Sequence, residues 1–470
     1  MKWESDQKPV LYKASHLIVK FALHLFFEKI QTRHSHNIPQ AGPVIFVVNH
    51  PNSIMDALLF GILTERKVNY IAHAGLFNNS FFGYFLRSCG TIPVYRQVDN
   101  PEKMGENTLM FTEAVDRLEH GETIGIFPEG VSDMQRKVQR LKTGAARIVF
   151  EAEKKHDYGL GVKLIPVGLH FFSRFHFQSR VLANFGRPID LTRWFDQHKD
   201  DSNSAVKNLT THIQHELEKL TISVENHELE DAINEIEEIY HDELRTAETD
   251  TANTIAEKID FQISKGIADC VQHFSRTDPE RFIYLRRMVQ SYLRRLKHLR
   301  LRDAMLRENI SYRQTWVNVF SAYFQASPGL LPAIYGILNN YIPYRITESI
   351  ARKFVHERTK ILTALFFGGG ISFFLFHAIQ SAVVAYFFGA FAAAVYFLSL
   401  PLSGFYALKY ITGIRALNKK LSFSFYLLSN KTLLKRMRHR RNLLVTELDK
   451  MKEEYLTFID AERPNRGRTH

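Results

Sequence analysis

The segment Asn49-His50-Pro51-Asn52-Ser53-Ile54-Met55-Asp56 follows a short apolar run and places an imidazole six residues before a carboxylate. An imidazole whose tautomer is fixed by a carboxylate can take a proton from a hydroxyl group. Because positions six apart lie about 240° from each other on an ideal helix, His50 must lie in a loop and Asp56 in the first turns of the following helix. Ser53 is a candidate N-cap for that helix. The alternative is a capping Asp beside a structural His.

Three further motifs carry groups that suit a phosphorylated, hydroxylated substrate. The motif GTIPVYR ends in Arg96, and a fixed guanidinium there suits a bidentate phosphate contact. The motif FPEG forces a sharp turn that presents Glu129 at a strand end, where it could accept hydrogen bonds from substrate hydroxyls. The motif IPVG lies in an apolar run and is expected to be a structural wall. The basic residues that follow FPEG are Arg136, Lys137, Arg140, Lys142 and Arg147.

The elements that must position these groups lie between residues 34 and 200, where apolar runs alternate with helical stretches. This alternation predicts an α/β layer with a largely parallel sheet. In such a sheet, reactive groups are usually exposed where strands end and helices start, as at His50. The predicted strands are 44–48, 68–72, 91–94, 123–127, 163–170 and 181–185, and the predicted helices include 56–63, 109–120 and 144–155.

The four motifs in their order resemble the signature of the PlsC-type glycerolipid acyltransferases over about residues 34–195. The tract that runs from FPEGVSDM to LIPVGLHF is most similar to the glycerol-3-phosphate/dihydroxyacetone-phosphate acyltransferase branch and its bacterial relatives. The common family pattern has four residues between His and Asp, whereas five separate His50 from Asp56. A loop can absorb the extra residue without loss of contact.

The resemblance implies direct acyl transfer from acyl-CoA or acyl carrier protein to a phosphorylated glycerol, without an acyl-enzyme. His50 would be the general base, Asp56 would orient it, and Arg96 would bind the acceptor phosphate. Glu129 and Gly130 would bind the glycerol backbone of the acceptor. No cofactor and no metal ion are expected. The predicted substrate-binding set is Asn49, Arg96, Phe127, Pro128, Glu129, Gly130, Lys142, Arg147 and Pro166.

The acceptor stays open among glycerol 3-phosphate, dihydroxyacetone phosphate and 1-acyl-glycerol 3-phosphate. One alternative is a lysophospholipid remodelling acyltransferase or transacylase. Another is a non-catalytic membrane scaffold that retains the fold, against which the joint presence of His50, Asp56, Arg96 and Glu129 argues.

The charge of the chain points to an anionic partner. Lys and Arg number 61 against 49 Asp and Glu, a net charge of +12. Nucleic acid, phosphorylated metabolites and lipid headgroups all fit this balance. No RNA- or DNA-binding motif occurs, so we expect no nucleic-acid partner and expect a phospholipid membrane instead. The two cysteines, Cys89 and Cys270, cannot form a disulfide framework.

The 48 residues from 361 to 408 contain no Asp, Glu, Lys or Arg. Since one spanning helix needs about 20 apolar residues, this length predicts two spans, 361–377 and 382–408, with a turn near His377, Gln380 and Ser381. A buried soluble hairpin is the alternative. Basic residues on both flanks predict that both ends and the active site face the cytoplasm, and we expect the inner membrane of a bacterium.

The remaining segments complete the predicted organisation around the acyltransferase domain at 34–200. Residues 1–33 form an amphipathic helix that lies on a membrane or packs on the next domain. Residues 201–312 are helical and charged, with an acidic and a basic stretch that could pair. Residues 313–360 are broken by prolines and suggest interfacial or re-entrant helices. Residues 409–470 form a basic helical tail, whose KRMRHRR run suits anionic headgroups.

Overall fold

The computed structural model describes residues 10–96, 101–132, 137–172, 177–224, 227–248, 253–299, 301, 303, 306, 317, 320–324, 326–353, 358–429 and 431–466. The chain forms two compact units, each described by itself. The first consists of Met1–Ser223 and Ser349–Gly368, and the second of Val224–Glu348 and Gly369–His470.

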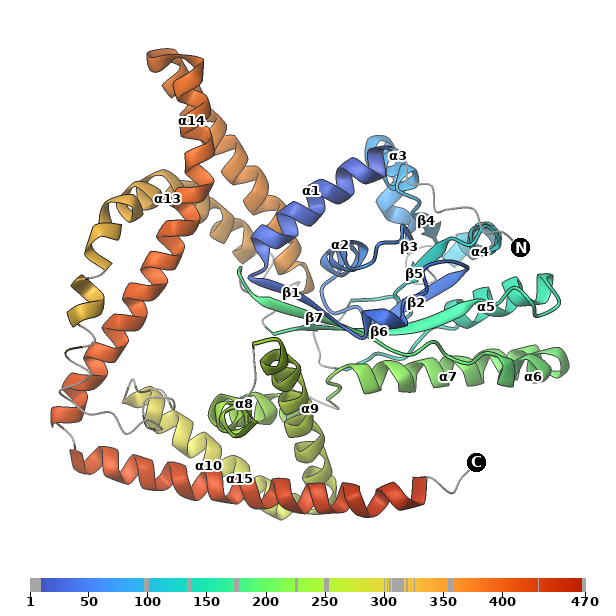
Figure 1. Ribbon diagram of the computed structural model, residues 1–470. Coiled ribbons are helices and arrows are strands. Elements are labelled where there is room, and N and C mark those ends of the chain that lie inside the picture. Colours follow the sequence, from blue (N-terminus) through green and yellow to red (C-terminus); the bar gives the residue numbers. More distant parts are fainter. Residues whose placement is uncertain are drawn as a thin grey trace. The chain divides into compact units, whose positions relative to one another are not determined.

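The first unit is built on a seven-stranded sheet with the order β1-β7-β6-β2-β5-β3-β4 (Figure 1). All neighbouring strands are parallel except β6 and β7, which are antiparallel. The largely parallel α/β sheet predicted from the sequence is therefore confirmed. The strands are β1 (Lys29–Arg33), β2 (Val44–Val48), β3 (Val68–His73), β4 (Ile92–Val94), β5 (Thr123–Ile126), β6 (Lys163–Phe171) and β7 (Arg180–Phe185).

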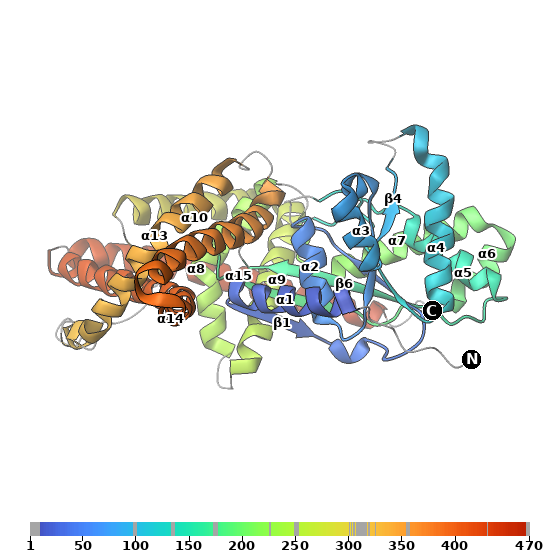
Figure 2. The ribbon, with the colours of Figure 1, turned by 90° about the horizontal axis from the view of Figure 1, so that it is seen from above.

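Helices cover both faces of the sheet. They are α1 (Val10–Phe26), α2 (Ile54–Leu63), α3 (Ser80–Ser88), α4 (Asn107–Glu119), α5 (Gly144–Lys155), α6 (Phe195–Asp200) and α7 (Ser202–Leu220). Figure 1 shows α1 and α2 on one face and α5 and α7 on the other, and Figure 2 looks down onto the α1 and α2 face. Strand β2 is buried throughout, and its residues alternate between the two apolar clusters that these layers enclose.

The N-terminal helix is shorter than the sequence predicts. It ends at Phe26 because Lys29–Arg33 pairs with β7 as an edge strand. Its last turn is buried through Leu23 and Phe26, whereas Leu17 and Phe21 are exposed. The helix therefore both packs on the domain and presents an apolar face.

The second unit contains only helices among the described elements. They are α8 (His227–Glu248), α9 (Asn253–Thr277), α10 (Pro279–His298), α13 (Leu330–Lys353) up to Glu348, α14 (Ile361–Ser429) from Gly369 onward and α15 (Lys431–Arg466). The acidic and basic stretches pair with each other, as Arg286 does with Glu228 at 2.5 Å. In the KRMRHRR run, Arg441 is buried against Asp303 and Glu243 and so is held inside the unit rather than presented to headgroups.

Helix α14 contains the 48-residue apolar stretch, and one predicted feature of it is wrong. The chain remains helical through His377, Gln380 and Ser381, where we expected a turn. The break lies instead at Gly389, whose φ of 84° and ψ of 169° divide α14 into two helical arms. Figure 1 shows α14 as two helical arms that run in opposite directions. Within the described residues, Ile361–Arg415 is long and apolar enough to cross a membrane.

The first turns of α14 belong to the first unit. Leu362 is buried in the apolar cluster beside α1, and Phe366 lies against Phe26 with ring centroids 5.4 Å apart. The predicted domain boundary at residue 361 therefore falls seven residues before the division between the units at Gly368.

Candidate active site

His50 and Asp56 meet where β2 ends and α2 begins. The Nδ1 atom of His50 lies 2.9 Å from Oδ2 of Asp56. The Asp56 side chain is fully buried, whereas that of His50 is 20% exposed. The backbone N–H of Asn52 also donates to Oδ2 of Asp56, at 2.7 Å, which fixes the carboxylate. With Nδ1 donating to Asp56, Nε2 is the ring nitrogen that can accept a proton.

The loop between the two residues is strained. Ser53 has a φ of 54°, a left-handed value that costs free energy in a non-glycine residue. It occupies the predicted N-cap position, but its side chain makes no capping hydrogen bond. Its backbone N–H instead donates to Oγ of Ser132 at 2.9 Å. The loop is therefore held by the segment that follows FPEG.

Glu129 holds the same loop from β5. Its Oε1 atom accepts the backbone N–H of His50 at 2.9 Å, and its Oε2 atom accepts the backbone N–H of Gln139 at 3.1 Å. The residue is only 5% exposed. Burial raises the pKa of Glu129, and the two backbone N–H groups oppose that rise. Both carboxylate oxygens therefore already bind the scaffold.

Phe127 supports the imidazole ring. It stacks on His50 with ring centroids 4.3 Å apart, and its ring is also parallel to that of Tyr70, with centroids 6.1 Å apart. The Tyr70 hydroxyl donates to the carbonyl of Ala57 in α2 at 2.8 Å. Strands β3 and β5 thus fix the ring plane of a residue that follows β2. Pro128 is buried next to it.

Two cationic side chains meet at Gly130. Nη1 of Arg96 donates to the Gly130 carbonyl at 2.9 Å. The aliphatic chain and Nζ of Lys142 lie over the same glycine, since a Cβ atom there would be 3.0 Å from both Cε and Nζ. The structure therefore brings Arg96 and Lys142 together beside the turn that contains Glu129. Arg147 is exposed on α5, Lys137 and Arg140 are exposed, and Arg136 lies outside the described residues.

Residues 29–170 match the sequence model of the family described as Acyltransferase. The chain contains an acyltransferase domain. Similar proteins include Glycerol-3-phosphate O-acyltransferase 1 of Saccharomyces cerevisiae, 22% identical over 65% of this chain and 50% of the relative. Glycerol-3-phosphate O-acyltransferase 2 of the same yeast is 27% identical over 42% and 25%, respectively. The chain thus spans half the length of the first yeast relative and a quarter of the second.

Two bacterial proteins are similar to part of this chain as well. The 1-acyl-sn-glycerol-3-phosphate acyltransferase of Borreliella burgdorferi is 25% identical over 40% of this chain and 73% of the relative. The crystal structure of the 1-acyl-sn-glycerophosphate acyltransferase PlsC from Thermotoga maritima is 21% identical, covers 44% of this chain and 79% of that one, and superposes with a TM-score of 0.33.

Asn49 and Pro166, both predicted to contact substrate, contribute to the scaffold of the acyltransferase domain. The Asn49 amide exchanges two hydrogen bonds with the backbone of Leu169, at 3.1 Å and 2.6 Å, and so joins the end of β2 to β6. Pro166 is buried in β6 opposite Val47, with its ring against Gly186. The position of Pro166 fits the expected structural wall.

Sequence reasoning missed Asn107, which orients the segment containing Arg96. Its side chain accepts the backbone N–H of Tyr95 and donates to the Tyr95 carbonyl, both at 2.9 Å. In the sequence, Asn107 is recognisable only as an amide residue near the start of a predicted helix, where it resembles an ordinary helix cap. Asn52 was also missed, because nothing in the motif distinguishes a fully buried amide from an exposed one.

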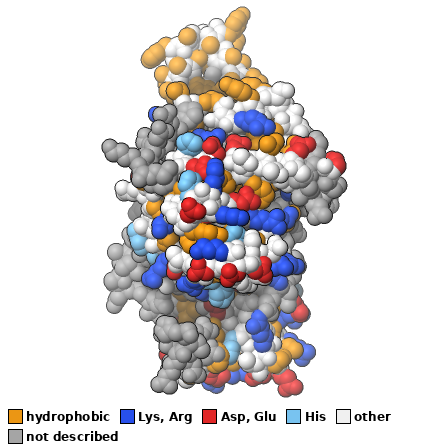
Figure 3. Space-filling model, turned by 90° about the vertical axis from the view of Figure 1, so that its right-hand side faces the viewer, with side chains coloured by type: hydrophobic (Ala, Val, Ile, Leu, Met, Phe, Trp, Pro, Cys, Tyr) orange, Lys and Arg blue, Asp and Glu red, His pale blue; other side chains and the backbone are white. Residues whose placement is uncertain are grey.

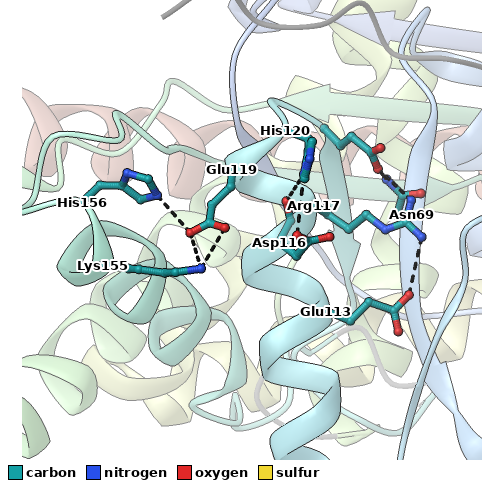
Figure 4. A network of polar contacts seen from close by, with 9 residues as sticks. Asn69, Glu113, Asp116, Arg117, Glu119, His120, Lys155 and His156 are labelled. Atoms are coloured by element: carbon teal, nitrogen blue, oxygen red, sulfur yellow. Dashed lines mark hydrogen bonds and ion pairs between the residues drawn. The ribbon is translucent and has the colours of Figure 1, made fainter.

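A separate polar network fixes α4, which begins with Asn107, against α5 (Figure 4). Oε1 of Glu119 lies 2.7 Å from Nζ of Lys155 and 2.9 Å from Nε2 of His156. These groups lie at the helix ends and stabilise the scaffold of the acyltransferase domain. In the part of the chain that the structure describes, no group of three or more His, Cys, Asp or Glu residues could hold a metal ion.

Proposed function

We propose that this chain is a glycerolipid O-acyltransferase that uses a thioester donor, acyl-CoA or acyl carrier protein, and a phosphorylated glycerol acceptor. The observation that supports this most is the His50–Asp56 pair at the end of β2, with Arg96 and Lys142 gathered at Gly130 nearby in the same domain. A hydroxyl group on a phosphorylated acceptor needs a base to take its proton and a cationic group to bind the phosphate.

The geometry supports a direct transfer. Nε2 of His50 takes the proton of the acceptor hydroxyl while the hydroxyl oxygen attacks the thioester carbonyl carbon. The tetrahedral intermediate then collapses, the C–S bond breaks, and the imidazolium returns its proton to the departing sulfur. Asp56 stabilises the imidazolium between these steps, as a buried carboxylate does in other His-assisted acyl transfers.

The preferred acceptor in this proposal is glycerol 3-phosphate. The two yeast relatives are named for it, and the Borreliella relative is named for 1-acyl-glycerol 3-phosphate. Arg96 and Lys142 would bind the phosphate that these acceptors share, together with dihydroxyacetone phosphate. Glu129 is assigned to positioning His50 rather than to binding the glycerol backbone, because both of its oxygens accept backbone N–H groups.

We also propose that α14 anchors the protein in a phospholipid membrane. Its arms expose large apolar side chains, among them Phe374, Tyr386 and Phe391, and basic residues flank the apolar stretch on both sides. These flanks favour a cytoplasmic position for both ends. The location in the inner membrane of a bacterium stays a prediction. Retention of the full chain in the membrane pellet after alkaline carbonate washing tests the anchor.

One experiment tests the reaction. The full chain, purified in detergent, is incubated with labelled acyl-CoA or acyl carrier protein and a panel of acceptors, and the products are separated by thin-layer chromatography. We expect labelled lysophosphatidate from glycerol 3-phosphate, lost in His50→Ala and retained in His120→Ala, a control at an exposed surface histidine. Transfer only to neutral lysophospholipids would favour the remodelling alternative. No transfer to any acceptor would favour the scaffold alternative.

A further inference from the structure

Helix α13 contacts both arms of α14 through amide side chains. Oδ1 of Asn340 lies 3.0 Å from Nε2 of His377 in the first arm, and its Nδ2 donates to the carbonyl of Leu400 in the second arm at 3.3 Å. The adjacent Asn339 repeats this pattern. It receives the Gln380 amide at 3.3 Å and the Tyr396 hydroxyl at 2.6 Å.

These contacts lie at one level of the hairpin. His377 precedes Gly389 by 12 residues and Leu400 follows it by 11, so both lie about 17 Å along their arms from the reversal at a helical rise of 1.5 Å per residue. Further contacts extend the interface to both sides, from Thr347 to Ser372 at 2.8 Å and from Tyr335 to Ser399 at 2.7 Å. The amide pair of α13 therefore joins the two arms.

Small residues let the helix backbones approach. A methyl group on Gly336 of α13 would overlap the carbonyl of Ser403 in the second arm, and one on Gly404 would lie 2.9 Å from the Asn340 side chain. Close approach through glycine combined with interhelical amide hydrogen bonds is typical of helices that associate in lipid.

The distribution of polarity in this helix group is the reverse of that in a water-soluble bundle. The polar side chains point inward, with Asn340 only 8% and His377 only 5% exposed. The apolar side chains point outward, with Leu338 of α13 72% and Phe391 of α14 86% exposed. Figure 3 shows many hydrophobic side chains on the surface of the α14 hairpin, at the top of the view. In water this arrangement would expose its apolar groups and bury its polar ones.

We infer that α13 lies in the bilayer together with α14, with its outward side chains facing lipid hydrocarbon and Asn339 and Asn340 locking it to both arms. Helix α13 is less apolar than α14 because it contains these two amides and, toward its C-terminal end, Arg345, Glu348, Arg352 and Lys353. The amides are nevertheless compatible with lipid, since α14 satisfies their hydrogen bonds. The occupant of the exposed apolar face is hydrocarbon rather than one protein partner, because the exposed side chains continue from α13 along both arms. This inference rests on the proposed anchoring by α14.

The test places a fluorescent label at single cysteines in the full chain, after Cys89 and Cys270 have been replaced by alanine. The labelled positions are Leu338→Cys in α13, Phe374→Cys in α14 and, as an aqueous control, Asp196→Cys, whose side chain is 91% exposed. The protein is reconstituted in vesicles that contain lipids with spin labels on their acyl chains. We expect the spin-labelled acyl chains to quench the fluorescence of the label at Leu338→Cys as strongly as at Phe374→Cys. The fluorescence of the Asp196→Cys control should not change.

Quenching at position 374 without quenching at 338 would overturn the inference and leave the α14 anchor intact, whereas absence of quenching at both would overturn the two together.

A second pair of variants tests the lock in the Leu338→Cys protein. Gly336→Ala should reduce the quenching because its methyl group would displace α13 from Ser403. Gly370→Ala should not, since a Cβ atom there meets nothing within 4 Å among the described residues. Equal quenching in both variants would show that the close contact between Gly336 and Ser403 does not hold α13 in place.

Discussion

Replacing Glu129 with glutamine should slow acyl transfer without removing any group that contacts substrate in the proposed mechanism. The carboxylate accepts the N–H of His50 with one oxygen and the N–H of Gln139 with the other. In glutamine one of these oxygens becomes an NH2 group, which can only donate. One of the two backbone N–H groups therefore loses its acceptor in a site that is 5% exposed.

The expected size of the effect follows from that lost hydrogen bond. A hydrogen bond to a charged group contributes about 1.5–3 kcal/mol, and each 1.36 kcal/mol of transition-state free energy changes a rate about tenfold. If the whole of this free energy is lost from the positioning of His50 in the transition state, kcat should decrease by about 10- to 150-fold. If part of this free energy is lost from the stability of the folded protein instead, kcat decreases less and the free energy of unfolding decreases correspondingly.

The pH dependence gives a second signature. Burial raises the pKa of Glu129, so ionising it in the folded protein costs more than in the unfolded chain. Stability should therefore decrease as the pH rises from the ordinary pKa of a glutamate to the raised one. Activity should change in the opposite sense, because the ionised carboxylate accepts the two N–H groups more strongly than the protonated acid does. Wild-type kcat should decrease as the pH falls through the raised pKa, and Glu129→Gln should lack both dependences.

Steady-state kcat and acceptor KM, measured across this pH range at saturating acyl donor, test the reasoning, and thermal unfolding confirms that the variant is folded. Glu119→Gln, in the network of Figure 4, is the matched control and should retain the wild-type kcat. A raised acceptor KM with unchanged kcat would refute the positioning role. That result would restore the interpretation suggested by the family resemblance, in which Glu129 binds the acceptor.

Other variants separate the remaining roles. His50→Ala should lower kcat by at least about 100-fold in labelled acyl transfer, and turnover equal to wild type would exclude the dyad. Asp56→Asn should also lower kcat, with the protein still folded by circular dichroism. Arg96→Ala and Lys142→Ala should raise KM more for a phosphorylated acceptor than for a neutral one, and equal effects would argue against a phosphate site. Asn107→Ala should lower the unfolding free energy by about 1–3 kcal/mol and raise the same KM, as thermal denaturation and kinetics would show.

Most of the sheet could be predicted because its strands are apolar runs bounded by Gly, Pro and Asn. Strand β2 is buried on both faces, and its predicted limits agree with the structure. Strand β1 could not be predicted in this way. Its sequence, KIQTR, is polar and partly exposed, and only its pairing with β7, about 150 residues later, makes it a strand. Such a pairing leaves no trace in local periodicity.

The spacing of His50 and Asp56 predicted their contact, since a loop followed by a helix start allows few arrangements. The partners of Asn49 and Glu129 could not be predicted. Residue type defines what a side chain can donate or accept, but not whether it contacts substrate or backbone. Glu129 and Ser132 each contact a residue 79 positions earlier, which only the order of β2 beside β5 brings near.

The turn expected at His377, Gln380 and Ser381 was wrong for a related reason. Polar residues within an apolar run are typical of a turn, but they occur equally where a helix contacts polar groups of another helix. The amides of Asn339 and Asn340, about 40 positions earlier, supply those groups. Gly389 was the better signal for a reversal, because glycine adopts a φ of 84° without strain.

The contacts around His50 indicate where substitutions should act on kcat and where on KM. Its backbone is held by Glu129, its ring by Phe127 and Asp56, and the Asp56 carboxylate by the N–H of Asn52. A base fixed in this way before substrate binds needs little reorganisation in the transition state, and loss of any one contact should lower kcat. Arg96 has a different position, on a short segment after an edge strand. A side chain placed there contacts a substrate group remote from the reacting bond, so its loss should change acceptor binding first.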